Sequence, residues 1–372
     1  MKQTNNIQLI LFAPSIHTGG GTELVLINLA NELAERKFNI FIAVNIIGNN
    51  IYHELNKNIR IKQYWFGKIR SKYSRNIILR IFNKMFSKIL LSSFLKSSFG
   101  NSISLIISFS NAITVDCYNT CYKNRLFAFE HWPYWITNKT PKFQNVINSI
   151  YPRLKKVIVL TEHEKNVYKD LGCNVEKIPN AYSFLPEKNS DLNQKTVLSI
   201  GHFNAQKRRD LLIKAWNTVQ NKHKDWKLII VGDGPEKTEN IKLMKELKII
   251  DSVEIIKPTS QIFDYYLNAS IFVLSSEYEA LPMVLIEAKA CGLPCVSFNI
   301  ISGPNELINN YEDGFLVSFP DYEELANKMN ILIEDENLRK KFGVNARKDV
   351  LNRFNPSTIY EKWENLIKEN IK

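Results

Sequence analysis

Short apolar runs alternate with amphipathic stretches along most of the chain. The first run, Ile7–Ala13, is almost wholly apolar, as expected for a strand buried on both faces, and a glycine-rich turn and an amphipathic stretch over 22–36 follow it. Similar runs recur, and we predict strands at Phe38–Ile46, Leu105–Phe109, Lys156–Leu160, Thr196–Ile200, Lys227–Val231, Val253–Ile256, Ile271–Leu274 and Cys295–Phe298. Strands that alternate with helices are typical of parallel sheets with crossover helices, so an α/β protein is predicted.

One segment interrupts this alternation. Residues 179–195 are rich in Pro, Asn and Ser and show no periodicity, so we predict a linker there. A chain of 372 residues is long enough for two domains with separate cores. We expect one Rossmann-like domain over 1–185 and another over 186–354, with an amphipathic helix over 355–372 that packs back on the first. In two doubly wound domains facing each other across a cleft, ligands are expected in that cleft, at the carboxyl ends of the strands.

The charge of the chain is unevenly distributed. The formal net charge is +12, but residues 1–185 hold 24 Lys and Arg against 10 Asp and Glu, whereas the remainder holds 25 against 27. Between Glu54 and Asp116 there is no acidic residue, and eleven basic residues lie in the segment 57–96. One half of the protein is therefore expected to meet an anionic partner.

The basic segment contains a candidate membrane-binding helix. Within residues 77–99 polar residues recur every four positions, at Arg80, Lys84, Lys88, Ser92 and Lys96. Large apolar residues fill the other positions, which is typical of a helix in a bilayer interface, where each basic residue contributes about 1 kcal/mol. A domain helix with a solvated basic face is the alternative. No nucleic-acid-binding motif accompanies the charge, so nucleic acid is not an expected partner.

No transmembrane helix or signal peptide is expected. The chain has no stretch of about 18 uncharged apolar residues. The short apolar run near the N-terminus breaks into three glycines at 19–21, which indicates a first strand and its turn. Together with the basic segment, these features favour a cytoplasmic protein that associates peripherally with the inner face of the cell membrane.

The cysteines give no metal signal. There are five of them, at Cys117, Cys121, Cys173, Cys291 and Cys295. No cluster of histidine or further cysteine completes a zinc site around either closely spaced pair. Buried free thiols in a reducing compartment are therefore expected, and no bound metal.

The stretch SSEYEALPMVLIEAKACGLP, residues 275–294, carries the clearest chemical signal. Pro282 suits the start of a helix, and Gly292 suits its end. The helix between them is apolar on every side, so Glu287 is expected to be a buried carboxylate, while Glu279 lies in the loop ahead. Buried carboxylates need hydrogen bonds, which a ligand rich in hydroxyl groups would supply. The alternative is that Glu287 stabilises the first turns of a surface helix.

Four segments occur together in an order and spacing typical of one family. They are IGHFNAQKRRDLLIKAW at 200–216, VGDGPE at 231–236, the 275–294 stretch, and SGPNELI with EDGFLV within 302–317. On these motifs residues 196–318 resemble the C-terminal domain of the family 4 retaining glycosyltransferases, which have the GT-B fold. Glu279 and Glu287 match the family's two glutamates separated by seven residues. The segments GGGTELVLINLANELAERKF at 19–38 and VIVLTEHEKNVYKDLG with KIPNAY within 157–182 extend the resemblance to the N-terminal domain.

The resemblance implies an enzyme that moves a hexose or N-acetylhexosamine from a nucleotide diphosphate sugar, with UDP expected, to a glycan or polyprenyl-linked acceptor in surface polysaccharide synthesis. By this analogy Glu279 holds hydroxyls of the donor sugar and Glu287 holds the ribose hydroxyls. The backbone N–H groups of the segment 280–283 would meet the sugar or the diphosphate; its residues are Ala280, Leu281, Pro282 and Met283. The resemblance implies no metal or other cofactor, since the nucleotide sugar is a substrate.

Further donor-site residues follow from the same resemblance. Lys207 matches the family's diphosphate-binding lysine, and a fixed cation there stabilises the departing nucleotide. His202 stands where the family usually has arginine, and a histidine offers no bidentate fork. Arg208 or Arg209 would compensate, although a solvated position at the helix start is expected for at least one of them. The turn formed by Gly232, Asp233 and Gly234 is also assigned to the donor site.

In the N-terminal domain the resemblance points to a glycine turn and a histidine. Gly20 and Gly21 match the loop that faces the donor phosphates. Glu23 and Glu306 match family glutamates, and each is also explained as a residue that stabilises a helix terminus. His131, in the sequence FEHWP, lies where the family often has a histidine near the reacting carbon. A structural histidine after a strand is an equal alternative.

No carboxylate in the sequence is clearly a covalent nucleophile. The resemblance therefore favours front-face attack, in which the leaving phosphate takes the acceptor proton and the protein supplies position and charge. Two other functions stay open, a nucleotide-sugar epimerase of the same fold and a non-catalytic subunit that binds nucleotide or glycan. An epimerase would convert the donor without an acceptor, and His202 in place of arginine keeps the non-catalytic subunit open.

Overall fold

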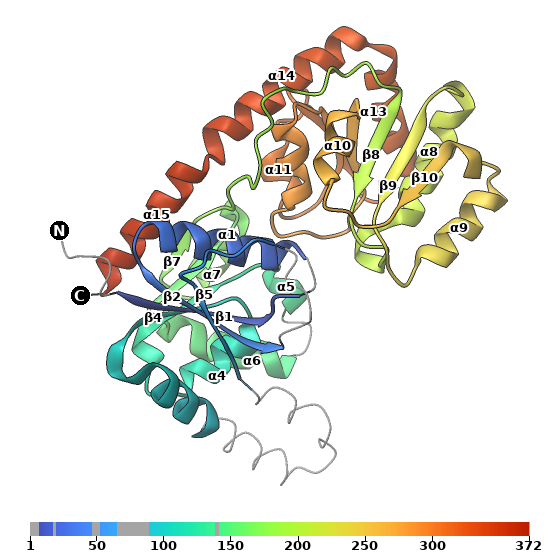
Figure 1. Ribbon diagram of the computed structural model, residues 1–372. Coiled ribbons are helices and arrows are strands. Elements are labelled where there is room, and N and C mark those ends of the chain that lie inside the picture. Colours follow the sequence, from blue (N-terminus) through green and yellow to red (C-terminus); the bar gives the residue numbers. More distant parts are fainter. Residues whose placement is uncertain (1–6, 18–19, 47–52, 65–88, 138–140, 372) are drawn as a thin grey trace. The chain divides into compact units, whose positions relative to one another are not determined.

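The computed structural model describes residues 7–17, 20–46, 53–64, 89–137 and 141–371 (Figure 1). The chain divides into two compact units, the first made of Met1–Pro179 with Ser357–Lys372 and the second of Asn180–Pro356. Each unit is a parallel sheet with helices on both of its faces, as the alternation of apolar runs predicted.

The first unit contains a seven-stranded sheet in the order β3-β2-β1-β4-β5-β6-β7. All of its strand pairs are parallel, and the strand order reverses between β1 and β4. Its central strands are buried on both sides, which explains why they are apolar throughout. The strands are β1 (Gln8–Ser15), β2 (Asn39–Ile46), β3 (Arg60–Gln63), β4 (Ile103–Ser108), β5 (Leu126–Phe129), β6 (Lys156–Val159) and β7 (Val175–Lys177).

The second unit contains a six-stranded parallel sheet in the order β10-β9-β8-β11-β12-β13. The strand order reverses between β8 and β11. In doubly wound sheets such a reversal marks the crevice in which ligands bind. The strands are β8 (Thr196–Ile200), β9 (Lys227–Val231), β10 (Val253–Ile256), β11 (Ile271–Leu274), β12 (Cys295–Asn299) and β13 (Gly314–Ser318).

Helices follow most of the strands. Those of the first unit are α1 (Gly21–Glu35), α4 (Asn111–Tyr118), α5 (Tyr134–Thr137), α6 (Pro141–Ile150), α7 (Glu162–Asp170) and the C-terminal α15 (Pro356–Asn370), together with a helix over 89–99. Those of the second unit are α8 (Arg209–Lys222), α9 (Lys237–Glu246), α10 (Ile262–Leu267), α11 (Met283–Ala290), α12 (Pro304–Leu307), α13 (Tyr322–Glu334) and α14 (Glu336–Arg353).

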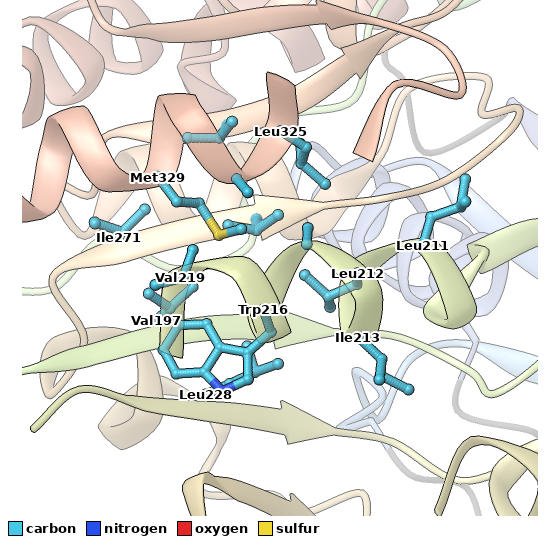
Figure 2. Packing of buried hydrophobic residues seen from close by; sticks show 14 of the residues in the cluster. Val197, Leu211, Leu212, Ile213, Trp216, Val219, Leu228, Ile271, Leu325 and Met329 are labelled. Carbon is cyan, nitrogen blue, oxygen red and sulfur yellow. The ribbon is translucent and has the colours of Figure 1, made fainter. Parts of the chain in front are cut away.

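The second unit has a large apolar core between its sheet and the helices α8 and α13. Figure 2 shows Trp216 of α8 next to Leu228 of β9, while Met329 extends from α13 toward α8, and all three belong to one core cluster. All three side chains are fully buried. The amphipathic spacing of α8 places Leu212, Trp216 and Val219 on the same helix face, so this helix is held mainly by packing.

The C-terminal helix α15 belongs to the first unit. Trp363, which is buried, packs edge-on against Phe129 of β5 with ring centroids 4.9 Å apart. Arg36 at the end of α1 pairs with Glu364 at 2.7 Å. A helix that follows the whole second unit in sequence therefore contributes to the core of the first.

Most of the segment predicted as a linker is part of the second unit. The hydroxyl of Ser190 donates to the carbonyl oxygen of Ala269 at 2.6 Å, its amide donates to that of Cys291 at 2.9 Å, and Leu192 is buried. The division of the chain accordingly falls after Pro179, not after residue 185 as predicted. These contacts are largely hydrogen bonds to backbone atoms, and such bonds leave no hydrophobic periodicity in the sequence.

Four of the cysteines are buried free thiols, but Cys121 is exposed, so the expectation of burial was wrong for that residue. Burial raises the pKa of Cys173 and Cys291 to about 12, which keeps both as neutral thiols. Among the residues that the structure describes, no group of three His, Cys, Asp or Glu side chains is placed to hold a metal ion.

The predicted membrane-binding helix is described only in part. Residues 65–88 lie outside the described residues, and the membrane prediction stays a prediction there, including its residues Arg80, Lys84 and Lys88. The described helix over 89–99 buries Leu91, Leu95 and Phe99 in the first core and leaves Lys96 exposed. For these residues the arrangement is that of a domain helix with a solvated basic face. None of the described helices is long and apolar enough to cross a membrane.

Candidate active site

Helix α11 lies between the two residues from which its ends were predicted. Pro282 is the N-cap and adopts an extended conformation, so the helix begins at Met283, one residue later than expected. Gly292 ends it with a φ of +77°, and the amide of Leu293 donates to the carbonyl oxygen of Ala288 at 3.0 Å. Glycine adopts such a φ without strain, which is why the helix stops there.

Glu279 and Lys207 form an ion pair beside the start of α11. Glu279 lies in the loop after β11 and is 8% exposed, and Lys207 ends a short 3-10 turn after β8. The Lys207 ammonium lies 2.5 Å from Oε1 of Glu279, and the hydroxyl of Ser276 donates to the same oxygen at 2.7 Å. Two residues predicted to bind the donor are thus in direct contact.

Glu287 is a buried carboxylate, as the apolar helix predicted. It is 7% exposed, and burial raises its pKa above the usual range. Tyr266 donates its hydroxyl to Oε2 at 2.8 Å, and Ser183 donates to Oε1 at 3.2 Å. A ligand rich in hydroxyl groups was expected to supply hydrogen bonds to Glu287, and in this structure two side chains of the same unit donate one bond to each oxygen.

The loop before α11 is supported by a second turn. Gly303, with a φ of +91°, packs so closely that a Cβ there would lie 2.8 Å from the carbonyl oxygen of Ala280 and 2.9 Å from Cδ of Pro282. The hydroxyl of Ser302 donates to the same carbonyl at 3.3 Å. Ala280, Leu281, Pro282 and Met283 are all buried. Their backbone is accordingly held in one position, next to Glu279.

Two glycine turns pack against each other at the carboxyl ends of β8 and β9. A Cβ on Gly232 would overlap the carbonyl oxygen of Gly201, and one on Gly234 would lie 2.6 Å from Nδ1 of His202. His202 is exposed, and its Nδ1–H donates to the carbonyl oxygen of Asp233. Close approach of two backbones is a physical reason for glycine at these positions. The histidine ring is tied to the turn that the sequence assigned to the donor site.

Arg209 is the buried member of the Arg208–Arg209 pair, of which at least one was expected to be solvated. It is 1% exposed, and its guanidinium donates to the hydroxyl of Ser199 and, at 3.1 Å, to the carbonyl oxygen of Gly201. Burial lowers its pKa to about 10, which leaves the group charged at neutral pH. Arg208 has a left-handed backbone with a φ of 44° and pairs with Asp210 at 2.9 Å. Arg208 is the more exposed of the two, and Arg209 is an internal cation near the glycine turns.

Gly20 and Gly21 lie at the start of α1 in the first unit, with Gly20 as N-cap. Both are exposed, and among the described residues outside its chain neighbours and its own helix backbone no atom lies within 4 Å of a Cβ built on Gly21. Glu23 is 7% exposed, and its Oε1 accepts hydrogen bonds from the hydroxyl of Ser15 at 2.6 Å and the amide of His17 at 3.1 Å. Glu23 therefore connects the first turn of α1 to the end of β1, which is a structural role.

His131 lies just beyond β5, at the carboxyl edge of the first sheet. Its ring stacks on Phe109 with centroids 5.1 Å apart, and Phe129 packs against it at 4.1 Å. Burial lowers its pKa to about 3, so the imidazole is neutral near pH 7. Such a group is suited to hydrogen bonding and poorly suited to taking up a proton at neutral pH.

The predicted site residues are divided between the two units. Gly20, Gly21 and His131 belong to the first unit, and all other predicted site residues belong to the second. Within the second unit, the loops after β8, β9 and β11 bring together the glycine turns, Lys207 and Glu279. These loops start at neighbouring strands, on both sides of the point where the strand order reverses.

The burial of two acidic side chains in the first unit was not predicted from the sequence. Glu130 and Glu164 are each 3% exposed, and burial raises the pKa of each to about 7. Tyr151 donates its hydroxyl to Glu130 at 2.7 Å, and the amide of Tyr134 donates to Glu164 at 3.0 Å. A signal was available for Glu130, because it directly follows the apolar run that forms β5.

Comparison with known proteins identifies the family. The profile of the family described as "Glycosyl transferases group 1" matches residues 183–349. An uncharacterized glycosyltransferase of Haemophilus influenzae is 31% identical over 363 residues, which cover 96% of this chain and 98% of that protein. The chain belongs to the glycosyl transferases group 1 family.

Two further proteins are similar to this glycosyltransferase over nearly its whole length. A Campylobacter jejuni protein named GalNAc-α-(1→4)-GalNAc-α-(1→3)-diNAcBac-PP-undecaprenol α-1,4-N-acetyl-D-galactosaminyltransferase is 28% identical over 374 residues, 97% of this chain and 98% of that protein. The crystal structure of S. aureus TarM, a mutant of which has been crystallised with UDP and α-GlcNAc-glycerol, matches with a TM-score of 0.81 at 16% identity, covering 97% of this chain and 98% of TarM. The chain therefore has the GT-B fold.

Proposed function

We propose that this glycosyltransferase moves a hexose or N-acetylhexosamine from a UDP-sugar, with retention at the anomeric carbon, to a glycan or polyprenyl-linked glycan. The observation that carries the proposal is the contact between Lys207 and Glu279 beside the helix that holds Glu287. The relative named for an undecaprenyl-diphosphate-linked glycan and the TarM complex with UDP support the acceptor and donor classes.

The Lys207–Glu279 pair is suited to a sugar diphosphate, with the ammonium group at the phosphates and the carboxylate at the sugar. In this structure the two charges neutralise each other at 2.5 Å. A diphosphate carries more negative charge than one carboxylate and competes for the Lys207 ammonium. Glu279, relieved of its partner, then accepts hydrogen bonds from hydroxyls of the sugar. The N-terminal amides of α11 add a positive field for the phosphates.

The transfer step needs little from the protein beyond position and charge. The bond between the anomeric carbon and the phosphate oxygen breaks, and a bond to the acceptor oxygen forms on the same face of the sugar. The leaving phosphate oxygen takes the acceptor proton, so the nucleotide leaves as UDP. A neutral His131 is consistent with this route, because no side chain has to remove the proton. The Lys207 cation stabilises the negative charge that develops on the phosphate.

Glu287 is suited to the ribose of the donor. Its two oxygens are fixed by Tyr266 and Ser183, and each oxygen has a further lone pair for a hydroxyl group. A vicinal diol offers two donors at the spacing of one carboxylate. We therefore assign the ribose hydroxyls to Glu287.

A membrane-bound acceptor agrees with the charge of the first unit. The basic segment 57–96 holds eleven Lys and Arg and no Asp or Glu. We propose that it attaches the enzyme to the anionic inner face of the cell membrane. Charge reversal of Arg80, Lys84 and Lys88 to Glu should abolish sedimentation with phosphatidylglycerol vesicles; unchanged sedimentation would remove this part of the proposal.

The function is tested with purified full-length protein and UDP-glucose, UDP-galactose, UDP-GlcNAc or UDP-GalNAc, with and without glycan acceptors. Glu279→Gln and Glu287→Gln should each abolish transfer, while Glu336→Gln, at a side chain that is 56% exposed, should leave it unchanged. Proton NMR of the product should show the anomeric configuration of the donor. Isomerised donor without acceptor would identify an epimerase, and UDP binding without any turnover would identify a non-catalytic subunit.

A further inference from the structure

Two indole side chains lie exposed in the first unit. Trp132 and Trp135 are each 43% exposed. Among the described residues of this unit the only other large apolar side chain with comparable exposure is Ile89. Between the two tryptophans the chain turns inward, because Pro133 is buried and Tyr134 is half-buried. The two indoles are therefore exposed on either side of a segment that packs inward.

These indoles follow the strand end at which a ligand is expected. Strand β5 ends at Phe129, and Glu130, His131 and Trp132 come next. β5 lies between β4 and β6 in the parallel sheet, so Trp132 follows a strand that ends at the carboxyl edge of the unit. Ligands of doubly wound sheets bind along this edge.

The segment between the indoles is held by two polar side chains, the buried Glu164 and the exposed Asn148. The amide of Tyr134 donates to Oε2 of Glu164 at 3.0 Å, and the Tyr134 hydroxyl donates to Oδ1 of Asn148 at 2.5 Å. The Tyr134 ring packs edge-on against Tyr168 with centroids 5.5 Å apart. Burial of a carboxyl group costs free energy, and the buried Glu164 carboxyl accepts its hydrogen bond from the loop amide of Tyr134. The loop is thereby fixed before a ligand arrives, which lowers the entropy lost on binding.

We propose that Trp132 and Trp135 are a stacking platform for a pyranose ring of the acceptor glycan. This proposal rests on the proposed sugar transfer. The C–H face of a sugar ring is apolar and its rim is hydroxylated, so it stacks on an aromatic face while its hydroxyls stay hydrated. The loop that carries the indoles is held through the Tyr134 amide and follows a strand that ends at the carboxyl edge of the sheet, which suits a sugar ring of a bound acceptor. Binding of the indoles to a bilayer is the alternative outcome of the test.

The test compares Trp132→Ala, Trp135→Ala, Trp132→Phe and Trp135→Phe with Tyr311→Ala, which removes an aromatic side chain that is 62% exposed in the second unit. Acceptors are p-nitrophenyl glycosides of glucose, galactose, GlcNAc and GalNAc. Each alanine variant should raise KM for the acceptor about tenfold, far more than KM for the UDP-sugar, as expected for one lost aromatic contact. The phenylalanine variants should recover most of the affinity, and Tyr311→Ala should behave as wild type.

A direct binding assay separates this proposal from the proposed function. Binding of the methyl glycosides of GlcNAc and GalNAc is measured by calorimetric titration without any donor. Affinity that is lost in both alanine variants supports the platform even if the wild type transfers no sugar. Unchanged affinity and unchanged acceptor KM in both variants overturn it. Lost sedimentation with phosphatidylglycerol vesicles, with unchanged acceptor KM, would also overturn it and assign the indoles to a bilayer.

Discussion

The Lys207 ammonium lies 2.5 Å from the Glu279 carboxylate because the two residues follow neighbouring strands of the second sheet. Lys207 comes after β8 and Glu279 after β11, and the strand order reverses between these strands. Their side chains are 16% and 10% exposed, so the pair is largely shielded from water. An ion pair that is largely removed from water at such a reversal is placed to bind a charged ligand. Each of its two charges can exchange the other for a group of the ligand that binds it more strongly.

Replacement of Lys207 by Met should lower kcat for sugar transfer by roughly 10²- to 10³-fold, because the leaving diphosphate loses a fixed cation. The measurement is release of UDP at a saturating concentration of UDP-sugar. Lys242→Met is the matched control, since its side chain is 73% exposed and lies on α9. A Lys207→Met enzyme with a kcat close to that of the control would show that this ammonium does not stabilise the leaving group.

Tyr266→Phe should weaken UDP binding and destabilise the second unit. The Tyr266 hydroxyl is buried and donates to Oε2 of Glu287 at 2.8 Å. Its removal leaves one oxygen of a buried carboxylate with one partner fewer, which costs about 1–3 kcal/mol. Urea unfolding and calorimetric titration with UDP measure the two effects. Tyr311→Phe, at an exposed ring, is the control; equal stability and affinity in the two variants would contradict the prediction.

Gly303→Ala should lower kcat/KM for the UDP-sugar by more than its loss of folding stability explains. The added methyl group would lie 2.8 Å from the carbonyl oxygen of Ala280, so the backbone next to Glu279 has to move. Gly172→Ala is the matched control, because Gly172 also has a positive φ, +79°, but no described residue beyond its chain neighbours lies within 4 Å of its Cβ. Both variants should lose about 1 kcal/mol of stability from backbone strain.

The measurement for these glycine variants is kcat/KM for the UDP-sugar together with the urea midpoint. We expect a drop of at least about tenfold in kcat/KM for Gly303→Ala alone, since displacement of positioned groups by a fraction of an ångström has such effects. Equal losses of activity in the two variants would mean that the turn at Gly303 supports folding only.

The sequence predicted five of the six strands of the second unit, all but β13, and the burial of Glu287, because these features depend on local apolar patterns. It did not predict the partners of Glu287. Tyr266 and Ser183 lie far from it in sequence, and only the packing of α10 and the segment after Pro179 on α11 brings them close. The resemblance placed Lys207 and Glu279 in one site, whereas their direct contact follows from strand order, which local patterns do not contain.

The helical spacing of Arg209 indicates that its side chain is buried. Arg209, Leu212 and Trp216 are spaced as residues on one face of a helix, and the last two are fully buried. The same spacing places the guanidinium inside, against the end of β8. By contrast, the contacts of Ser190 with Ala269 and Cys291 involve backbone atoms, so no residue pattern marks them.

The stability of the first unit should fall as the pH rises from about 5 to about 7.5, and Glu164 should be one cause. Burial raises its pKa to about 7 from an ordinary value of 4.5, so the folded state favours the protonated form. A raised pKa contributes stability that is complete below about pH 4.5 and is lost as the pH rises through about 7. The difference between the two pKa values corresponds to about 3 kcal/mol.

Glu164→Gln stays neutral and keeps an oxygen for the Tyr134 amide. As the pH rises, the free energy of unfolding of this variant should therefore fall by about this amount less than that of the wild type. Urea unfolding at several pH values measures it, with Glu176→Gln, at a side chain that is 49% exposed, expected to follow the wild type. Parallel pH curves for wild type and Glu164→Gln would show that Glu164 is ionised in the folded protein throughout this range.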